Sequence, residues 1–107
     1  MINYEGRRFY NPEARDGVIA RYHQRGDLVW AHFAGGAVRR GSVTGLVDEN
    51  GALRLAYSMV LSDGEIVCGV NRITPERAAD GTLRLREEWE RLGPNGSQGV
   101  CYLEEIP

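Results

Sequence analysis

The sequence predicts a single all-β domain, an up-and-down antiparallel barrel of about eight strands that spans residues 1–107. Two observations lead to this prediction. Short stretches of alternating polar and apolar residues recur along the whole chain, and glycine-bearing turns separate them. Connections this short favour pairing between sequential neighbours. We therefore expect a meander whose first and last strands pair and close the barrel.

The alternating stretches define the expected strands. They are Gly6–Tyr10, Asp16–Gln24, Leu28–Ala34, Ala37–Val47, Leu53–Leu61, Ile66–Ile73, Thr82–Leu92 and Gly99–Glu105. The turns between them contain glycine where the backbone needs a positive φ. A helical turn is the alternative at Thr74–Ala79, because Thr74 is a suitable N-cap and Pro75 suits the first helical position.

Composition and charge exclude several classes of protein. Thirteen basic and fifteen acidic residues give a net charge of −2, so we expect no nucleic-acid partner. No apolar stretch is long enough to span a membrane, and Met1–Tyr10 has no basic and then apolar leader. We therefore expect a cytoplasmic protein with no membrane partner.

The two cysteines and two histidines do not predict a disulfide or a metal site. Cys68 and Cys101 fall on expected strands that are separated by one other strand, about 9–10 Å apart. That distance exceeds the limit for a disulfide, so we expect both to be reduced. His23 and His32 show no metal-ligand spacing. We expect neither a metal nor another cofactor.

Turn length sets which residues face each other across neighbouring strands, and hence which side chains point inward. We take Gly35-Gly36 and Asp63-Gly64 as two-residue turns and Glu49–Gly51 as a three-residue loop. The expected opposite pairs are Trp30 with Gly41, His32 with Arg39, Val43 with Tyr57, Gly45 with Leu55, Val47 with Leu53, Met59 with Cys68 and Leu61 with Ile66. A ring over a glycine, as at Trp30, fills a gap in a curved sheet.

This register gathers the polar and aromatic interior side chains at one end of the barrel, near the turns at Gly35, Asp63 and Gly93. The expected ligand-binding residues are Trp30, His32, Arg39, Tyr57, Glu87 and Trp89. An aromatic wall with a few polar groups is typical of a small-molecule pocket. We therefore expect a small, partly apolar ligand at this mouth, and an opposite half that is apolar and closed.

Two other functions fit the same pattern. An isomerase or hydrolase would use Glu87 and His32 as an acid–base pair, which requires both within reach of one substrate atom. A structural or protein-interaction module would use the outer surface, with a homodimer as one form. Its outward-leaning candidates are Ile2, Tyr4, Phe33 and Tyr102. Each interior residue also has a structural explanation, namely core packing for the tryptophans and a salt bridge or hydrogen bond for Glu87 and His32.

Three stretches resemble a group of small bacterial β-barrel proteins of about this length. They are Gly-x-Val-x-Gly-Leu-Val-Asp-x-x-Gly at Gly41–Gly51, Asp-Gly-x-Leu-Arg-Leu-x-Glu-x-Trp at Asp80–Trp89 and Gly-x-x-x-Leu-Glu-Glu at Gly99–Glu105. Members often carry the name N-acetylglutamate synthase, which implies acetyl transfer from acetyl-CoA. That chemistry needs a backbone-amide cradle at a helix N-terminus, and no glycine-rich loop followed by a helix is predicted. We therefore expect no such activity. The architecture is similar to the streptavidin-like and lipocalin-like (calycin) barrels, which implies a ligand in the mouth.

Overall fold

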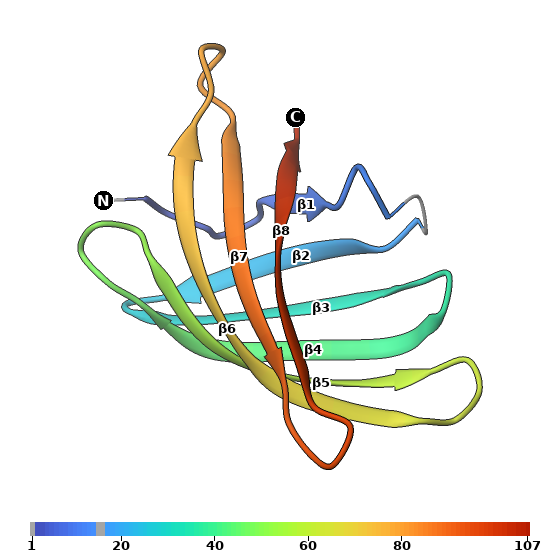
Figure 1. Ribbon diagram of the computed structural model, residues 1–107. Coiled ribbons are helices and arrows are strands. Elements are labelled where there is room, and N and C mark those ends of the chain that lie inside the picture. The colour runs from blue at the N-terminus through green and yellow to red at the C-terminus, as the bar shows by residue number, and fades with distance from the viewer. Residues whose placement is uncertain (1, 15–16) are drawn as a thin grey trace.

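Eight antiparallel strands follow one another around a closed barrel, and β1 pairs with β8 to close it (Figure 1). The computed structural model describes residues 2–14 and 17–107. The strands are β1 (Arg8–Tyr10), β2 (Ile19–Arg25), β3 (Leu28–Gly35), β4 (Val38–Val47), β5 (Leu53–Leu61), β6 (Ile66–Arg77), β7 (Leu83–Arg91) and β8 (Ser97–Ile106). The predicted all-β barrel, its strand order and its closure are confirmed.

The long strand β6 differs most from the prediction. It continues through Thr74 to Arg77, and the helical turn considered at Thr74–Ala79 is absent. Pro75 pairs with Leu85 of β7, while β5 reaches only as far as Ile73 along the other side of β6. Proline is tolerated in a strand where one side has no neighbour, since its missing N–H removes no ladder bond there. Asp16, the predicted start of the second strand, lies outside the described residues.

Three hairpin loops share one three-residue geometry, those between β4 and β5, β5 and β6, and β6 and β7, where Ala78 N–H donates to Thr82 O and Gly81 N–H to Ala78 O. At the β4–β5 loop, Asp48 N–H donates to Ala52 O and Gly51 N–H donates to Asp48 O. The β5–β6 loop repeats both bonds, between Leu61 and Glu65 and from Gly64 to Leu61. Gly51 and Gly64 have φ of 83° and 89°, the left-handed region that glycine enters without strain.

This geometry corrects the register predicted for Asp63-Gly64. The two residues close a three-residue loop, so Val60 and not Leu61 faces Ile66, and Ser58 faces Cys68. A shift of one residue moves every side chain of a strand to the other face. Inward positions on β6 are therefore held by Val67, Gly69, Asn71 and Ile73, whereas Ile66, Cys68 and Val70 are exposed.

The β3–β4 hairpin also differs from its predicted register. Gly35 faces Val38, and a β-bulge then shifts the pairing so that Phe33 faces Gly41. Trp30 therefore faces Thr44 instead of Gly41. Val29, Ala31 and Phe33 consequently point inward, and Trp30 and His32 point outward. At the β4–β5 loop, by contrast, the predicted pairing of Val47 with Leu53 is confirmed.

The two ends of the barrel are built differently. We call the end that carries the β2–β3, β4–β5 and β6–β7 turns the closed end. Tyr4 covers it from the N-terminal segment, fully buried, with its hydroxyl donating to Gly51 O at 2.6 Å. Tyr4 packs against Phe9 and Tyr22. Beneath them lies the apolar core, formed by Val29, Ala31, Val43, Val47, Leu53, Leu55, Ile73, Leu83 and Leu85.

Several hydrogen bonds hold the N-terminal segment in place, among them backbone bonds between Gly6 or Arg7 and Tyr22. Arg7 makes a two-pronged pair with Glu105, with both N–O distances at 2.8 Å, and Glu105 also accepts the Leu83 N–H. Tyr4 N–H donates to Gln24 Oε1.

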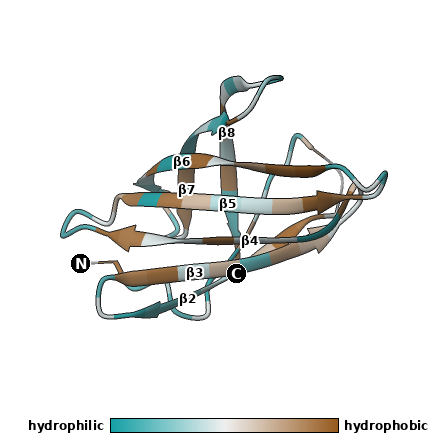
Figure 2. Ribbon diagram, turned by 90° about the horizontal axis from the view of Figure 1, so that it is seen from below, coloured by the Kyte–Doolittle hydropathy of each residue, from teal (hydrophilic) through white to brown (hydrophobic). Residues whose placement is uncertain are grey.

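Figure 2 shows the apolar colours along the strands and hydrophilic colours at many of the turns. Among the described residues, no helix has the length and apolar character needed to cross a membrane.

Candidate functional site

A cavity of about 330 Å³ lies at the other end of the barrel, which we call the open end. This end carries the β1–β2 loop and the β3–β4, β5–β6 and β7–β8 turns. Asn11, Ala14 and Val18 of the β1–β2 loop form part of the wall. The expectation that the turns near Gly35, Asp63 and Gly93 surround the mouth matches this arrangement.

Three aromatic rings lie over glycines on the wall of the cavity. Each ring and its glycine are directly opposite each other on neighbouring strands: Phe33 with Gly41, Tyr57 with Gly69 and Trp89 with Gly99. A Cβ atom built at any of these glycines would overlap the facing ring. The missing side chains let the rings lie along the sheet instead of projecting across the barrel. The glycines therefore keep the open end hollow.

A carboxyl group and a carboxamide meet inside this cavity. Glu87 of β7 lies between Asn71 of β6 and Cys101 of β8. Asn71 Nδ2 is 3.5 Å from Glu87 Oε2, and Cys101 Sγ is 3.4 Å from Glu87 Oε1. The contact from Asn71 is long for a hydrogen bond between nitrogen and oxygen, whereas the contact from Cys101 has an ordinary length for a thiol donor. Asn71 Oδ1 is buried and has no hydrogen-bond partner among the described residues.

Burial controls the protonation of these groups. Desolvation raises the pKa of Glu87 above its ordinary value, opposed by the hydrogen bond from Cys101. Burial, together with the nearby Glu87, raises the pKa of Cys101 to about 12. Burial also raises the pKa of Tyr22, with Glu87 as the next cause. The interior therefore favours neutral forms unless a bound group supplies a compensating charge.

The rim carries the one basic side chain among the described cavity-lining residues. Arg91 pairs with Glu65 at 3.8 Å and lies near the hydroxyl of Tyr57. The Tyr57 hydroxyl is 3.5 Å from Glu90 O. Burial raises the pKa of Tyr57, and Arg91 acts in the opposite direction.

Three of the six predicted ligand-binding residues reach the cavity. Tyr57, Glu87 and Trp89 line it. The interior positions predicted for Trp30, His32 and Arg39 are wrong. The first two lie on the outer face of β3, and Arg39 is exposed at an irregularity in the pairing of β4 with β5. The inward orientation predicted for these residues depended on the position of the turn at Gly35-Gly36. The β-bulge in this hairpin shifts the pairing, so Trp30 and His32 point to the outer face instead.

The predicted acid–base pair is not formed. Glu87 faces the interior, and His32 faces outward through a different part of the barrel wall. His32 instead belongs to an external cluster with His23 and Trp30, in which the His23 and Trp30 rings stack with centroids 5.5 Å apart. No single substrate atom is within reach of both groups.

Three of the four outward-leaning candidates are corrected, and Tyr102 lies on the outer face as expected. Tyr4 is buried, while Ile2 and Phe33 are partly buried and pack against the core. Tyr102 is partly buried on the outer face, where the Arg84 guanidinium lies 4.0 Å from its ring centroid. These residues do not form an exposed apolar patch.

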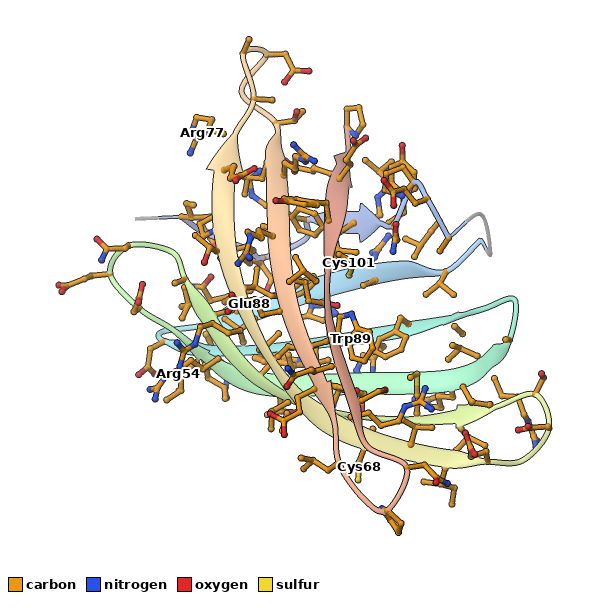
Figure 3. The ribbon with its side chains drawn as sticks, viewed as in Figure 1. Arg54, Cys68, Arg77, Glu88, Trp89 and Cys101 are labelled. Atoms are coloured by element: carbon orange, nitrogen blue, oxygen red, sulfur yellow. The ribbon has the colours of Figure 1, made fainter. Side chains whose placement is uncertain are left out.

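Sequence reasoning missed several cavity residues. Phe33, expected to lean outward, faces inward because of the bulge in the β3–β4 hairpin, and Asn71 faces inward because the β5–β6 loop has three residues. Cys101 alternates with Leu103 on β8, and that alternation was the available signal. Figure 3 shows Trp89 and Cys101 on the neighbouring strands β7 and β8, with Cys68 far from Cys101. Both cysteines are free, and Cys68 is exposed.

In the part of the chain that the structure describes, no group of three or more His, Cys, Asp or Glu side chains is placed to hold a metal ion.

Comparison with known proteins identifies the family of this barrel. No curated protein matches the sequence. A family model described as "Avidin-like protein" matches residues 2–106, which is nearly the whole chain. The chain, a closed eight-stranded antiparallel barrel with an aromatic cavity at one end, belongs to the avidin-like protein family.

Proposed function

We propose that this protein binds a small, partly apolar molecule in the cavity at the open end. The avidin-like barrel commonly binds small ligands. The observation that carries the proposal is the set of aromatic rings over glycines, which lines a cavity of about 330 Å³ with flat apolar surfaces. Aromatic walls with a few polar groups are typical of sites that bury most of a small ligand.

The polar groups in the cavity support the same function. A buried acceptor without a partner costs free energy in the empty protein. Asn71 Oδ1 is such an acceptor. A ligand that donates a hydrogen bond to it would relieve this cost, so the group favours the bound state. Trp89 lies against the same space and provides an intrinsic signal for binding.

Fluorescence of the neutral apolar probe N-phenyl-1-naphthylamine tests the proposal. We expect the probe to bind with enhanced fluorescence and to change the emission of Trp89. Ala20 lines the cavity between Phe9 and Phe33, so Ala20→Leu should reduce the affinity by about tenfold, equivalent to ~1.4 kcal/mol.

Ala56→Leu is the matched control, because the same methyl groups are added on the exposed outer face of β5. This variant should bind the probe as the wild type does. Equal affinities for the two variants, or no binding by the wild type, would contradict the proposal.

The alternatives from the sequence now have different support. The acid–base enzyme is not carried forward, since His32 and Glu87 lie on opposite sides of the barrel wall. A homodimer and a cytoplasmic location stay predictions. The oligomeric state can be measured by analytical ultracentrifugation.

A further inference from the structure

Two polar groups on the cavity wall, Asn71 and Glu87, have hydrogen-bond acceptor positions that are not filled. Asn71 Oδ1 is free to accept, and the Glu87 carboxyl has two side-chain contacts among the described residues, with Asn71 Nδ2 and Cys101 Sγ. A carboxylate has about four acceptor positions and an amide oxygen has two. Several acceptor positions at the same place in the cavity are thus left for a ligand with N–H donors.

Glu87 also lacks a cation. Its neighbours on the packed strands are Asn71 on β6 and Cys101 on β8, and the tyrosines that feel its charge are Tyr22 on β2 and Tyr57 on β5. None of these side chains is positively charged. No salt bridge between Glu87 and any described basic residue is formed, and Arg91 pairs with Glu65 at the rim. A carboxylate in an apolar site is costly unless it is paired.

The cavity walls suit a positive charge as well as an apolar body. The faces of tryptophan and tyrosine rings attract cations electrostatically. Trp89 lies on the same strand as Glu87, two residues further along, so both side chains point into the barrel. The carboxyl group and the indole therefore share one side of the cavity.

We propose that the polar end of the ligand is a primary ammonium group, which pairs with the Glu87 carboxylate and donates a hydrogen bond to Asn71 Oδ1. This inference rests on the proposed function and specifies its ligand class, an amine with a flat apolar body. The body lies against the rings of Trp89, Phe33 and Tyr57. A neutral or anionic head group would leave Glu87 without its counter-charge.

The proposal has a definite pH dependence. Burial raises the pKa of Glu87 in the empty protein, so at low pH the ammonium group must displace a proton. A bound cation stabilises the ionised carboxyl group. Affinity for an amine should therefore increase as pH rises through the Glu87 titration, up to about pH 10, where alkylammonium groups lose their own proton. A neutral amide should show no such increase.

Three probes with one indole body separate charge from shape: tryptamine, indole-3-propionamide and indole-3-propionate. Displacement of N-phenyl-1-naphthylamine at pH 8 should give the tightest binding for tryptamine, about tenfold tighter than for the amide, as a charge-assisted hydrogen bond allows. The propionate should bind most weakly. At pH 5 the difference between tryptamine and the amide should shrink.

Glu87→Gln keeps the shape of the side chain but removes its charge, and it should bring the affinities for tryptamine and the amide to the same value. Glu90→Gln is the matched control on the exposed outer face of β7 and should leave the tenfold preference intact. If Glu87→Gln does not fold, the pH series on the wild type decides the question.

The outcomes separate the two proposals. If the naphthylamine probe binds but the amide or propionate displaces it as well as tryptamine does, the amine inference is overturned and the binding function stands. If the naphthylamine probe itself does not bind, the binding function fails.

Discussion

The closed and open ends of this barrel are built from the same strands, yet one is filled and the other is hollow. At the closed end, inward positions hold branched aliphatic side chains such as Leu53 and Ile73, and Tyr4 covers them. At the open end, glycines face aromatic residues across three pairs of strands. Large side chains alone therefore do not fill a barrel. The residue opposite each large side chain on the neighbouring strand determines whether that side chain packs into the interior or lies flat against the sheet and leaves space.

The two ends also differ in what they are expected to contribute to folding stability and to ligand binding. Side chains at the closed end are fully removed from water, and each such burial contributes roughly 1.5–3 kcal/mol. Those at the open end are partly exposed to the cavity, and the partly buried carboxyl group of Glu87 lies among them. We therefore expect the closed end to supply most of the folding free energy and the open end to supply the binding site.

Truncating one apolar side chain at each end should give the largest effect. Leu53→Ala removes a fully buried side chain and should lower the free energy of unfolding by about 2–5 kcal/mol. Met59→Ala, at the cavity, should lower it by no more than ~1.5 kcal/mol. Urea denaturation measures both values. Equal losses would mean that the two ends do not differ in packing as described.

Adding one methyl group at the open end should have an intermediate effect. Gly99→Ala forces the Trp89 ring away from β8 and into the cavity, at a cost of about 1–3 kcal/mol for overpacking. Binding of the naphthylamine probe should weaken by roughly tenfold. Gln98→Ala, exposed on the outer face, is the control and should change neither quantity. Unchanged probe binding by Gly99→Ala would show that Trp89 does not form the wall of the site.

The smallest expected effect concerns charge on the two faces of β7. Because the pKa of Glu87 is raised in the folded state, the folded protein holds this proton more tightly than the unfolded chain does. Stability should therefore fall as pH rises from the ordinary glutamate value, 4.5, through the raised value. Glu87→Gln should remove this fall and be more stable than the wild type near pH 7.

Glu88, on the outer face of the same strand, should change stability with pH in the opposite direction to Glu87. Its pKa is lowered by the hydrogen bond from Arg86, so it contributes stability above its unfolded pKa that is lost as pH falls. Glu88→Gln should be less stable than the wild type near pH 7, and the two should converge at low pH. Thermal unfolding at pH 4 and pH 7 measures both variants. The same sign for the two variants would contradict the assignment of Glu87 to the interior.

The strand order and closure follow from the sequence because alternation and short turns need only local information. Register needs more. Asp63-Gly64 is compatible with a two-residue turn or with the end of a three-residue loop, and the Asp63 side chain, which accepts the Glu65 N–H, favours the second. This difference of one residue determines that Asn71 faces the cavity.

The candidate site shows the same dependence on register. Tyr57, Glu87 and Trp89 were placed correctly in the interior because their strands were assigned the right face. Trp30 and Phe33 both qualify as the ring over Gly41, and the choice depends on the bulge in the β3–β4 hairpin. A bulge has no reliable sequence signal. Coverage of the closed end by Tyr4 rests on contacts distant in sequence, such as the bond to Gly51, which local patterns do not reveal.

The positions of the two tryptophans give the protein two separate optical probes. Trp89 lies inside, over Gly99, and its emission responds to whatever enters the barrel. Trp30 lies outside, stacked on the imidazole of His23, and its emission responds to contacts on the outer surface. The variant Trp30→Phe keeps only the interior tryptophan, and Trp89→Phe keeps only the exterior one. Occupancy of the cavity can thus be followed by fluorescence independently of contacts on the outer surface.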